Sequence, residues 1–222
     1  MVNTLMSQPA KISQAQAAKL YDRLARVYDL WGFLTETKAR KRALELAAIQ
    51  DGQQVLEVAA GTGLAFVELV RSNPNGRNIG LDISAGMLAK AKKRLGNAGA
   101  VNFELLVASA YDIPEKDAAF DVVLNNYMFD LLDEQDWPRA ITEFYRVLKP
   151  GGNLVLANMT AGRRFGSGIY EKLYRMSPAL MGGCRGVQLA GPLRDHDFII
   201  TSREYFQQLL FPSEVILATK PG

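Results

Sequence analysis

A chain of 222 residues, 48% hydrophobic and 22% charged, is long enough for one sizeable α/β domain and has an ordinary soluble composition. Its net charge of +3 does not suggest a protein that coats nucleic acid, and its single cysteine excludes an internal disulfide framework. No stretch approaches the roughly 20 apolar residues of a spanning helix, and no signal-peptide pattern is visible. We therefore expect a cytoplasmic protein, with peripheral contact at the inner membrane face left open.

The first 50 residues are predicted to be mostly helical. After a polar tail, apolar residues recur at spacings of three and four from Leu20 to Leu34, and a second helix is predicted over about Glu36 to Ile49. Tyr21 and Tyr28 lie in the first of these helices. They either cover a bound ligand, which makes residues 1–50 a lid, or simply pack the helix onto the domain.

A glycine-rich turn follows an apolar, β-rich run that begins at Val55. The run ends in Ala59-Ala-Gly-Thr-Gly63 and passes directly into a helical pattern, which predicts a strand, a tight turn and a helix N-terminus. Gly61 and Gly63 leave no side chain between the backbone and a ligand, and the first N–H groups of the helix point toward the same place. This junction suits a dinucleotide, a nucleotide phosphate or the amino-acid end of a nucleoside cofactor.

The rest of the chain alternates predicted strands with predicted helices. Further strands are predicted at about 78–82, 102–107, 120–124, 153–158, 198–205 and 215–220. Helices are predicted at about 64–71, 85–95 and 134–148, and the last of these ends at a Lys149-Pro-Gly-Gly152 turn. The order predicts one doubly wound α/β domain, with a mostly parallel sheet and a ligand at the carboxyl ends of its strands.

Residues 159–197 interrupt this alternation and are predicted to form a substrate cap. Arginines alternate with aromatic residues in this stretch. Arg163, Arg164 and Arg185 are candidate substrate-binding residues, because guanidinium groups match the geometry of a phosphate. The alternative is that they are ordinary surface arginines.

Asp82 lies 19 positions after Gly63, at the end of the second predicted strand. A carboxylate there can accept two hydrogen bonds from a ribose diol. The dinucleotide fingerprint is incomplete, because Phe66 occupies the position of its third small residue, and no Gly-Lys-Ser/Thr phosphate loop follows. A nicotinamide-dependent oxidoreductase and a non-catalytic nucleoside-binding protein therefore stay remote alternatives.

Four segments together resemble the class I S-adenosylmethionine-dependent methyltransferases. They are Glu57-Val-Ala-Ala-Gly-Thr-Gly63, Gly80-Leu-Asp-Ile-Ser84, Phe120-Asp-Val-Val123 and Leu148-Lys-Pro-Gly-Gly152, in the order and spacing of that family. The resemblance covers about residues 20 to 160. It implies an enzyme with a Rossmann-like, seven-stranded sheet whose last strand is antiparallel, and S-adenosylmethionine as cofactor.

The resemblance also implies which residues hold the cofactor. They are Tyr21, Glu57, Ala59, Gly61, Gly63, Asp82, Ile83, Met87, Ser109, Ala110, Tyr111 and Asn125. Glu57 and the turn would meet the methionine and ribose side, and Asp82 the ribose hydroxyls. Ile83, Met87 and the segment 109–111 would meet the adenine, and Asn125 matches the residue at the end of the fourth strand. The chain departs from many relatives at Ser109, where they carry an acid; the alternative for Ser109 and Asn125 is loop capping.

Two further segments narrow the resemblance. Tyr21–Asp29 and Phe211–Lys220 resemble the branch that holds ubiquinone/menaquinone C-methyltransferases and bacterial phosphatidylethanolamine N-methyltransferases. The implied acceptor is a small amphiphile, with the amine of a phospholipid head group first. A quinone precursor, or another small molecule, is the alternative. Tyr28 and Tyr127 are the candidate catalytic residues, and neither a metal nor a nucleic-acid partner is expected.

Overall fold

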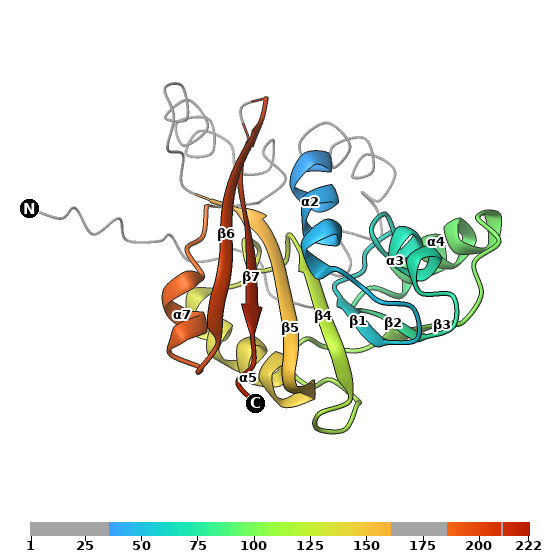
Figure 1. Cartoon of the computed structure of the whole chain (residues 1–222). Coiled ribbons are helices and arrows are strands. Elements are labelled where there is room, and N and C mark those ends of the chain that lie inside the picture. Colours follow the sequence, from blue (N-terminus) through green and yellow to red (C-terminus); the bar gives the residue numbers. More distant parts are fainter. Residues whose placement is uncertain (1–35, 161–185, 210) are drawn as a thin grey trace, which may run out of the picture.

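The computed structural model describes residues 36–160, 186–209 and 211–222, which form a seven-stranded sheet with helices on both faces (Figure 1). The strand order is β3-β2-β1-β4-β5-β7-β6. The strands are β1 (Gln54–Val58), β2 (Arg77–Asp82), β3 (Phe103–Val107), β4 (Phe120–Asn126), β5 (Leu148–Met159), β6 (Ile199–Gln208) and β7 (Phe211–Thr219). β1 to β5 pair in parallel and β7 is antiparallel to both of its neighbours, so the predicted fold class is confirmed.

The helices cover the two faces of the sheet separately. They are α2 (Thr37–Ala47), α3 (Phe66–Ser72), α4 (Ala85–Asn97), α5 (Trp137–Val147) and α7 (Ala190–Arg194), with a short 3-10 turn at Glu134–Asp136. The buried residues of α2 and α3 belong to one hydrophobic core, and those of α5, together with Leu193 of α7, belong to the other. None of the helices in the described part of the chain is long and apolar enough to cross a membrane.

Strand residues alternate between the two cores. In β5, Leu154 and Leu156 belong to the core beneath α5, whereas Val155 and Ala157 belong to the core beneath α2. A strand that is buried on both faces reads as a continuous apolar run, which is why these strands stand out in the sequence. The buried face of α2 consists of Ala39, Ala43 and Ala47. Because these side chains are small, the helix can approach the sheet closely.

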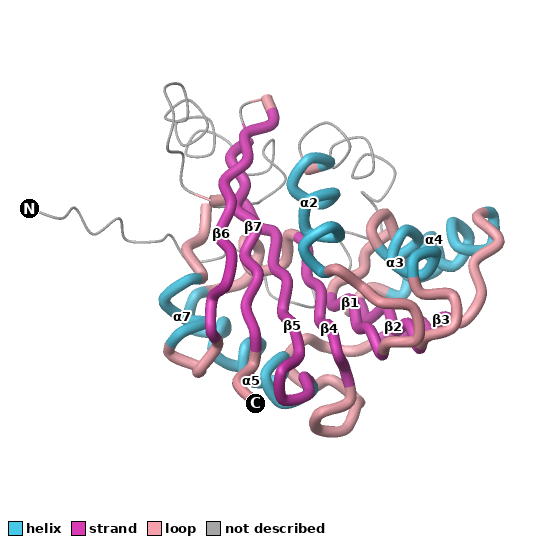
Figure 2. The backbone as a smooth tube through the Cα atoms, in the orientation of Figure 1, coloured by secondary structure: helices cyan, strands magenta, loops and turns pink. Residues whose placement is uncertain are grey.

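The first turn of α2 lies beside the end of the β6–β7 hairpin. The backbone N–H of Lys38 donates to Oε1 of Gln208 over 2.9 Å, and Arg42 forms an ion pair with Glu204 over 2.8 Å. Figure 2 shows this hairpin extending beyond the other strands, at the end of the sheet where α2 begins. The contacts fix the N-terminal end of α2 above the carboxyl ends of the central strands.

The prediction of a turn at Lys149-Pro-Gly-Gly152 is wrong in one respect. The helix ends at Val147 as expected, but the chain enters β5 at once, because Leu148 already pairs with Phe120. The extra residues are absorbed by a register shift, and Gly151 adopts a φ of 77°, which glycine tolerates without strain. This stretch is an irregular beginning of a strand.

Two predicted segments lie partly outside the described residues. Of the expected N-terminal lid, the structure describes residues 36–50, so the candidate residues Tyr21 and Tyr28 are outside it. Of the expected substrate cap, residues 159–160 and 186–197 are described, and they include α7. The three candidate arginines of the cap, Arg163, Arg164 and Arg185, are therefore outside it as well.

Candidate active site

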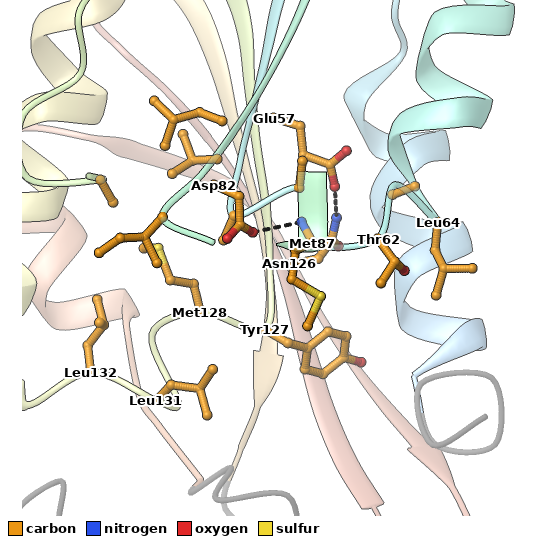
Figure 3. Close-up of a pocket in the computed structure, with 18 of the residues that line it drawn as sticks. Glu57, Thr62, Leu64, Asp82, Met87, Asn126, Tyr127, Met128, Leu131 and Leu132 are labelled. Atoms are coloured by element: carbon orange, nitrogen blue, oxygen red, sulfur yellow. Dashed lines mark hydrogen bonds between the residues drawn. The ribbon is translucent and has the colours of Figure 1, made fainter. Parts of the chain in front are cut away.

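A cavity of about 250 Å³ opens at the carboxyl ends of β1, β2 and β4 (Figure 3). β1 is flanked by β2 on one side and by β4 on the other, so the strand order reverses here. Open α/β sheets bind their ligands in the crevice at such a point. Glu57 at the end of β1, Asp82 at the end of β2 and Asn126 at the end of β4 all line the cavity.

The glycine turn after β1 is held tightly from behind. Gly61 and Gly63 adopt φ values of 56° and 79°, and the N–H of Gly63 donates to the carbonyl of Ala60 over 2.9 Å. A Cβ atom added to Gly63 would lie 3.0 Å from the Cβ of Ala91, so α4 packs directly against the turn. The guanidinium of Arg94 donates to Oγ1 of Thr62 over 2.8 Å. The turn is thus a fixed part of the cavity wall.

Ala59 carries the strain of this turn, because it adopts a φ of 57° without being glycine. The left-handed region costs a residue with a Cβ roughly 1–2 kcal/mol, whereas glycine loses about 0.5–1 kcal/mol through its greater freedom in the unfolded chain. We therefore expect Ala59→Gly to raise the free energy of unfolding by about 0.5 kcal/mol in urea denaturation. A clear loss of stability would show instead that the Ala59 methyl group, which packs on the core, matters more than the strain.

The Asp82 carboxylate joins the glycine turn to the start of α4. Its Oδ2 accepts from the N–H of Gly61 over 2.8 Å, and its Oδ1 accepts from the N–H of Ser84 over 2.9 Å. Ser84 in turn caps α4, accepting from the N–H of Met87 over 3.1 Å. A carboxylate offers about four acceptor positions, and that of Asp82 lines the cavity, where hydroxyl groups of a ligand can reach it.

Glu57 places a buried acid on the cavity wall. Its side chain is 2% exposed, and its Oε1 accepts from Nδ2 of Asn126 over 3.2 Å, as Figure 3 shows. Its Oε2 accepts no hydrogen bond from the residues that the structure describes. Burial raises the pKa of Glu57 from 4.5 to about 8, although the hydrogen bond from Asn126 and the charge of Arg40 both act to lower this pKa. A cationic group in the cavity is the partner that this carboxyl lacks.

Tyr127 contributes its ring to the cavity. The residue adopts a φ of 55°, and its hydroxyl lies 2.9 Å from Oγ of Ser213, with 4% of the residue exposed. Burial raises the pKa of Tyr127 well above its usual value, and the nearby Glu36 adds to this. Because the hydroxyl is bonded to the protein and hard to ionise, the geometry favours ring packing over proton transfer for this candidate catalytic residue.

The structure brings most of the predicted cofactor residues to one cavity. Those on its wall are Glu57, Ala59, Gly61, Asp82, Ile83, Met87, Ala110 and Tyr111, and Gly63 lies in the turn just behind them. Two others lie off the wall. Oγ of Ser109 accepts from the N–H of Tyr111 over 3.1 Å, and Nδ2 of Asn125 donates to the carbonyl of Val58 over 2.8 Å. Both contacts are of the local, backbone-bonding kind that the loop-capping alternative describes.

Several residues that line the cavity belong to no sequence motif that would have indicated a binding site. They are Glu36, Arg40, Asn126, Met128, Leu131, Leu132, Asp133 and Asp136. Within the described ranges, no group of three or more His, Cys, Asp or Glu residues is arranged to hold a metal ion. The only histidine of the sequence, His196, has Nδ1 2.8 Å from the carbonyl oxygen of Pro192, and it does not line the cavity.

Comparisons with known proteins agree with this geometry. A family model described as a methyltransferase domain matches residues 55–152. Over 210 residues the chain is 31% identical to a demethylmenaquinone methyltransferase of Thermotoga maritima, covering 92% of this chain and 86% of that protein. Among solved structures, the cyclase SpnF superposes with a TM-score of 0.77 at 18% identity, covering 96% of this chain and 98% of SpnF.

A second solved structure carries the cofactor product. It is the N-methyltransferase NodS from Bradyrhizobium japonicum in complex with S-adenosyl-L-homocysteine, with a TM-score of 0.67, 14% identity, and coverage of 84% of this chain and 88% of NodS. At these identities the solved structures support the fold, whereas the Thermotoga relative supports the family.

The residues present fit S-adenosylmethionine. The buried Oε2 of Glu57 suits an ammonium group, the Asp82 carboxylate suits a ribose diol, and the glycine turn leaves room for close approach of the ligand to the backbone. The methyl donor is therefore S-adenosylmethionine, and the chain belongs to the class I S-adenosylmethionine-dependent methyltransferases, within which it resembles the quinone methyltransferase branch.

Proposed function

We propose that this methyltransferase methylates a ring carbon of a quinone precursor, in the reduced form of a demethylmenaquinone. The support is the Thermotoga demethylmenaquinone methyltransferase, whose likeness extends over 92% of this chain rather than over the cofactor motifs alone. The relatives thus favour the quinone alternative over the phospholipid amine that was expected first from the sequence. Phospholipid methylation stays a prediction without support from them.

The apolar side of the cavity is consistent with a ring-shaped acceptor. Figure 3 shows Met128, Leu131 and Leu132 on the segment after β4, with the Tyr127 ring beside them. Apolar side chains beside a ring suit an aromatic acceptor, because one ring packs well against another. The polar residues Glu57 and Asp82 lie across the cavity from this segment in Figure 3. The cavity therefore has one side suited to a nucleoside and another suited to an aromatic acceptor.

The protein's contribution to the reaction is mainly positioning. S-adenosylmethionine supplies an electrophilic methyl carbon, and transfer is a displacement in which the nucleophile approaches in line with the breaking bond. Glu57 would hold the ammonium group of the donor and Asp82 its ribose, so that the donor does not rotate. Met128, Leu131 and Tyr127 would hold the acceptor ring and exclude water. Orientation of this kind alone can lower a barrier by about 7–11 kcal/mol.

The test is methyl transfer from labelled S-adenosylmethionine to three acceptors. They are a demethylmenaquinol with one prenyl group, vesicles of phosphatidylethanolamine, and a soluble phenol. We expect turnover on the quinol, with the methyl group on a ring carbon by mass spectrometry. Binding of S-adenosylhomocysteine, measured by calorimetry, confirms that each preparation is competent. Methylation of the vesicles without methylation of the quinol would overturn this acceptor and leave the enzyme class unchanged.

A further inference from the structure

A second buried acid lines the same cavity, and none of the sequence motifs includes it. Glu36 immediately precedes α2 and is 4% exposed. Its Oε1 is buried and accepts no hydrogen bond from any residue within the described ranges. Its side chain does not cap α2 either. A buried carboxyl oxygen without a hydrogen bond is costly, so an oxygen of this kind on a cavity wall indicates a ligand contact.

Glu36 and Glu57 have different surroundings. Besides burial, the pKa of Glu57 is shifted by Asn126, Arg40 and Asp82. The charge of Glu36 is influenced by Asp130 and Arg40, and Glu36 in turn influences Tyr127. Arg40 is common to both sets. It lines the cavity together with both acids, so the two carboxyl groups face one space.

The environment of Glu36 also suits a group that exchanges protons. Burial and the charge of the neighbouring Asp130 together raise its pKa from 4.5 to about 8, against a lowering by Arg40 on the same helix. From the sheet side, Tyr127 is the other titratable group beside it, and that hydroxyl lies against Ser213. A catalytic base is most efficient when its pKa lies near the working pH.

We propose that Glu36 is a catalytic residue, which accepts the proton of the acceptor's ring hydroxyl during methyl transfer. This rests on the quinol acceptor proposed above. Two other candidates are less suitable: the Tyr127 hydroxyl is engaged by Ser213, and His196 lies against the Pro192 carbonyl, away from the cavity. Glu36 is buried, lines the cavity and has an oxygen without a hydrogen bond among the described residues.

The step balances without any further reactant. The Glu36 carboxylate takes the hydroxyl proton, and the electron pair of that O–H bond moves into the ring. The adjacent ring carbon then attacks the methyl carbon, and the C–S electron pair returns to sulfur, which leaves neutral S-adenosylhomocysteine. The attacking carbon loses its hydrogen to water as a proton, and the ring oxygen recovers its proton from Glu36. One methyl group has replaced one ring hydrogen, and one proton has been released.

The test compares Glu36→Gln, Glu36→Asp and a control, Glu45→Gln. Glu45 is on the same helix but is exposed and pairs with Arg42 at the surface. With the quinol, we expect Glu36→Gln to lower kcat by about 100-fold or more, with KM and the affinity for S-adenosylhomocysteine within about twofold. Wild-type kcat should rise with pH toward about 8 because Glu36 must lose its proton. The Gln variant should lose that rise, and the Asp variant should keep it with a lower kcat.

Three results would overturn the proposal. The first is an unchanged kcat in Glu36→Gln. The second is at least tenfold weaker binding of S-adenosylhomocysteine with normal kcat at saturating donor, which would assign Glu36 to the cofactor. The third is an identical pH profile in Glu36→Gln and wild type. Should Glu36→Gln fail to fold, the Asp variant decides: a lower kcat with normal cofactor affinity is expected there, and an unchanged kcat would overturn the proposal.

Failure of the proposed function is recognised separately. A wild-type enzyme that binds S-adenosylhomocysteine but does not methylate the quinol refutes the acceptor, whatever the variants do. The same variants are then measured on phosphatidylethanolamine vesicles, because a protonated amine must also lose a proton before it attacks the methyl group. An unchanged kcat there would refute the role of Glu36 as well.

Discussion

Replacing Asp82 with alanine is expected to weaken the binding of S-adenosylhomocysteine by at least about 100-fold. We propose that the carboxylate accepts hydrogen bonds from the ribose diol, and a hydrogen bond to a charged group contributes roughly 1.5–3 kcal/mol. Two of them correspond to a factor of 100 or more, since each 1.4 kcal/mol is about tenfold. The same change leaves the N–H groups of Gly61 and Ser84 without their acceptor, so the turn loosens as well. Calorimetric titration measures the loss directly.

The matched variant for this prediction is Asp82→Asn. Its amide oxygen can still accept from one of the two backbone N–H groups, but the NH2 group donates where the carboxylate accepted. We expect an affinity between those of wild type and Asp82→Ala. Methylthioadenosine keeps the ribose but lacks the amino-acid end, so Asp82→Ala should weaken it equally. An affinity of Asp82→Ala within about threefold of wild type would remove Asp82 from the ribose site.

Asp82 and Glu57 could be predicted as cavity residues from the sequence, because each lies at the end of an apolar, β-rich run. In a parallel sheet such residues meet at one edge, so the resemblance and the topology both pointed to them. The glycine turn was equally visible, because its two glycines adopt φ values that few other residues tolerate. Each of these features lies within a short stretch of the chain. Their order along the sequence was almost sufficient to predict the fold class.

Asn126 was missed for a reason of register. The fourth strand was predicted to end near residue 124, with Asn125 as the residue at its end, but β4 extends to Asn126. Side chains alternate along a strand, and Val122 and Leu124 point into the core beneath α2. Asn126 shares that face and meets Glu57, whereas Asn125 points the other way and bonds to the carbonyl of Val58.

Glu36 and Arg40 could not be predicted as cavity residues from local patterns. They reach the cavity because α2 packs its alanine face on the sheet, and because its first turn is tied to the β6–β7 hairpin. Those contacts join positions 170 residues apart in the chain. Composition and periodicity predicted the helix, but no spacing within it indicated which residues of its first turn would meet the end of β1.

The affinity for S-adenosylhomocysteine is expected to rise with pH because of Glu57. In the protein without ligand its pKa is about 8, so at pH 6–7 the native carboxyl is mostly protonated. An unfolded chain, with a pKa near 4.5, has already lost this proton, so Glu57 makes the folded protein less stable as pH rises from about 4.5 to 8. The ammonium group of the ligand favours the carboxylate, so binding releases a proton. Below pH 8, affinity should therefore increase by up to about tenfold per pH unit.

Calorimetry in two buffers with different ionisation enthalpies counts the released proton, and three controls assign it. Glu57→Gln has no proton to lose, so its affinity should be lower at pH 8 and nearly independent of pH. Methylthioadenosine lacks the ammonium group, so its binding to wild type should show no such slope. Glu36 has a similarly raised pKa but is assigned to the acceptor, so Glu36→Gln should keep the slope. A slope that survives in Glu57→Gln and disappears in Glu36→Gln would exchange the roles of the two acids: Glu36 would then hold the amino-acid end of the donor, and Glu57 would face the acceptor.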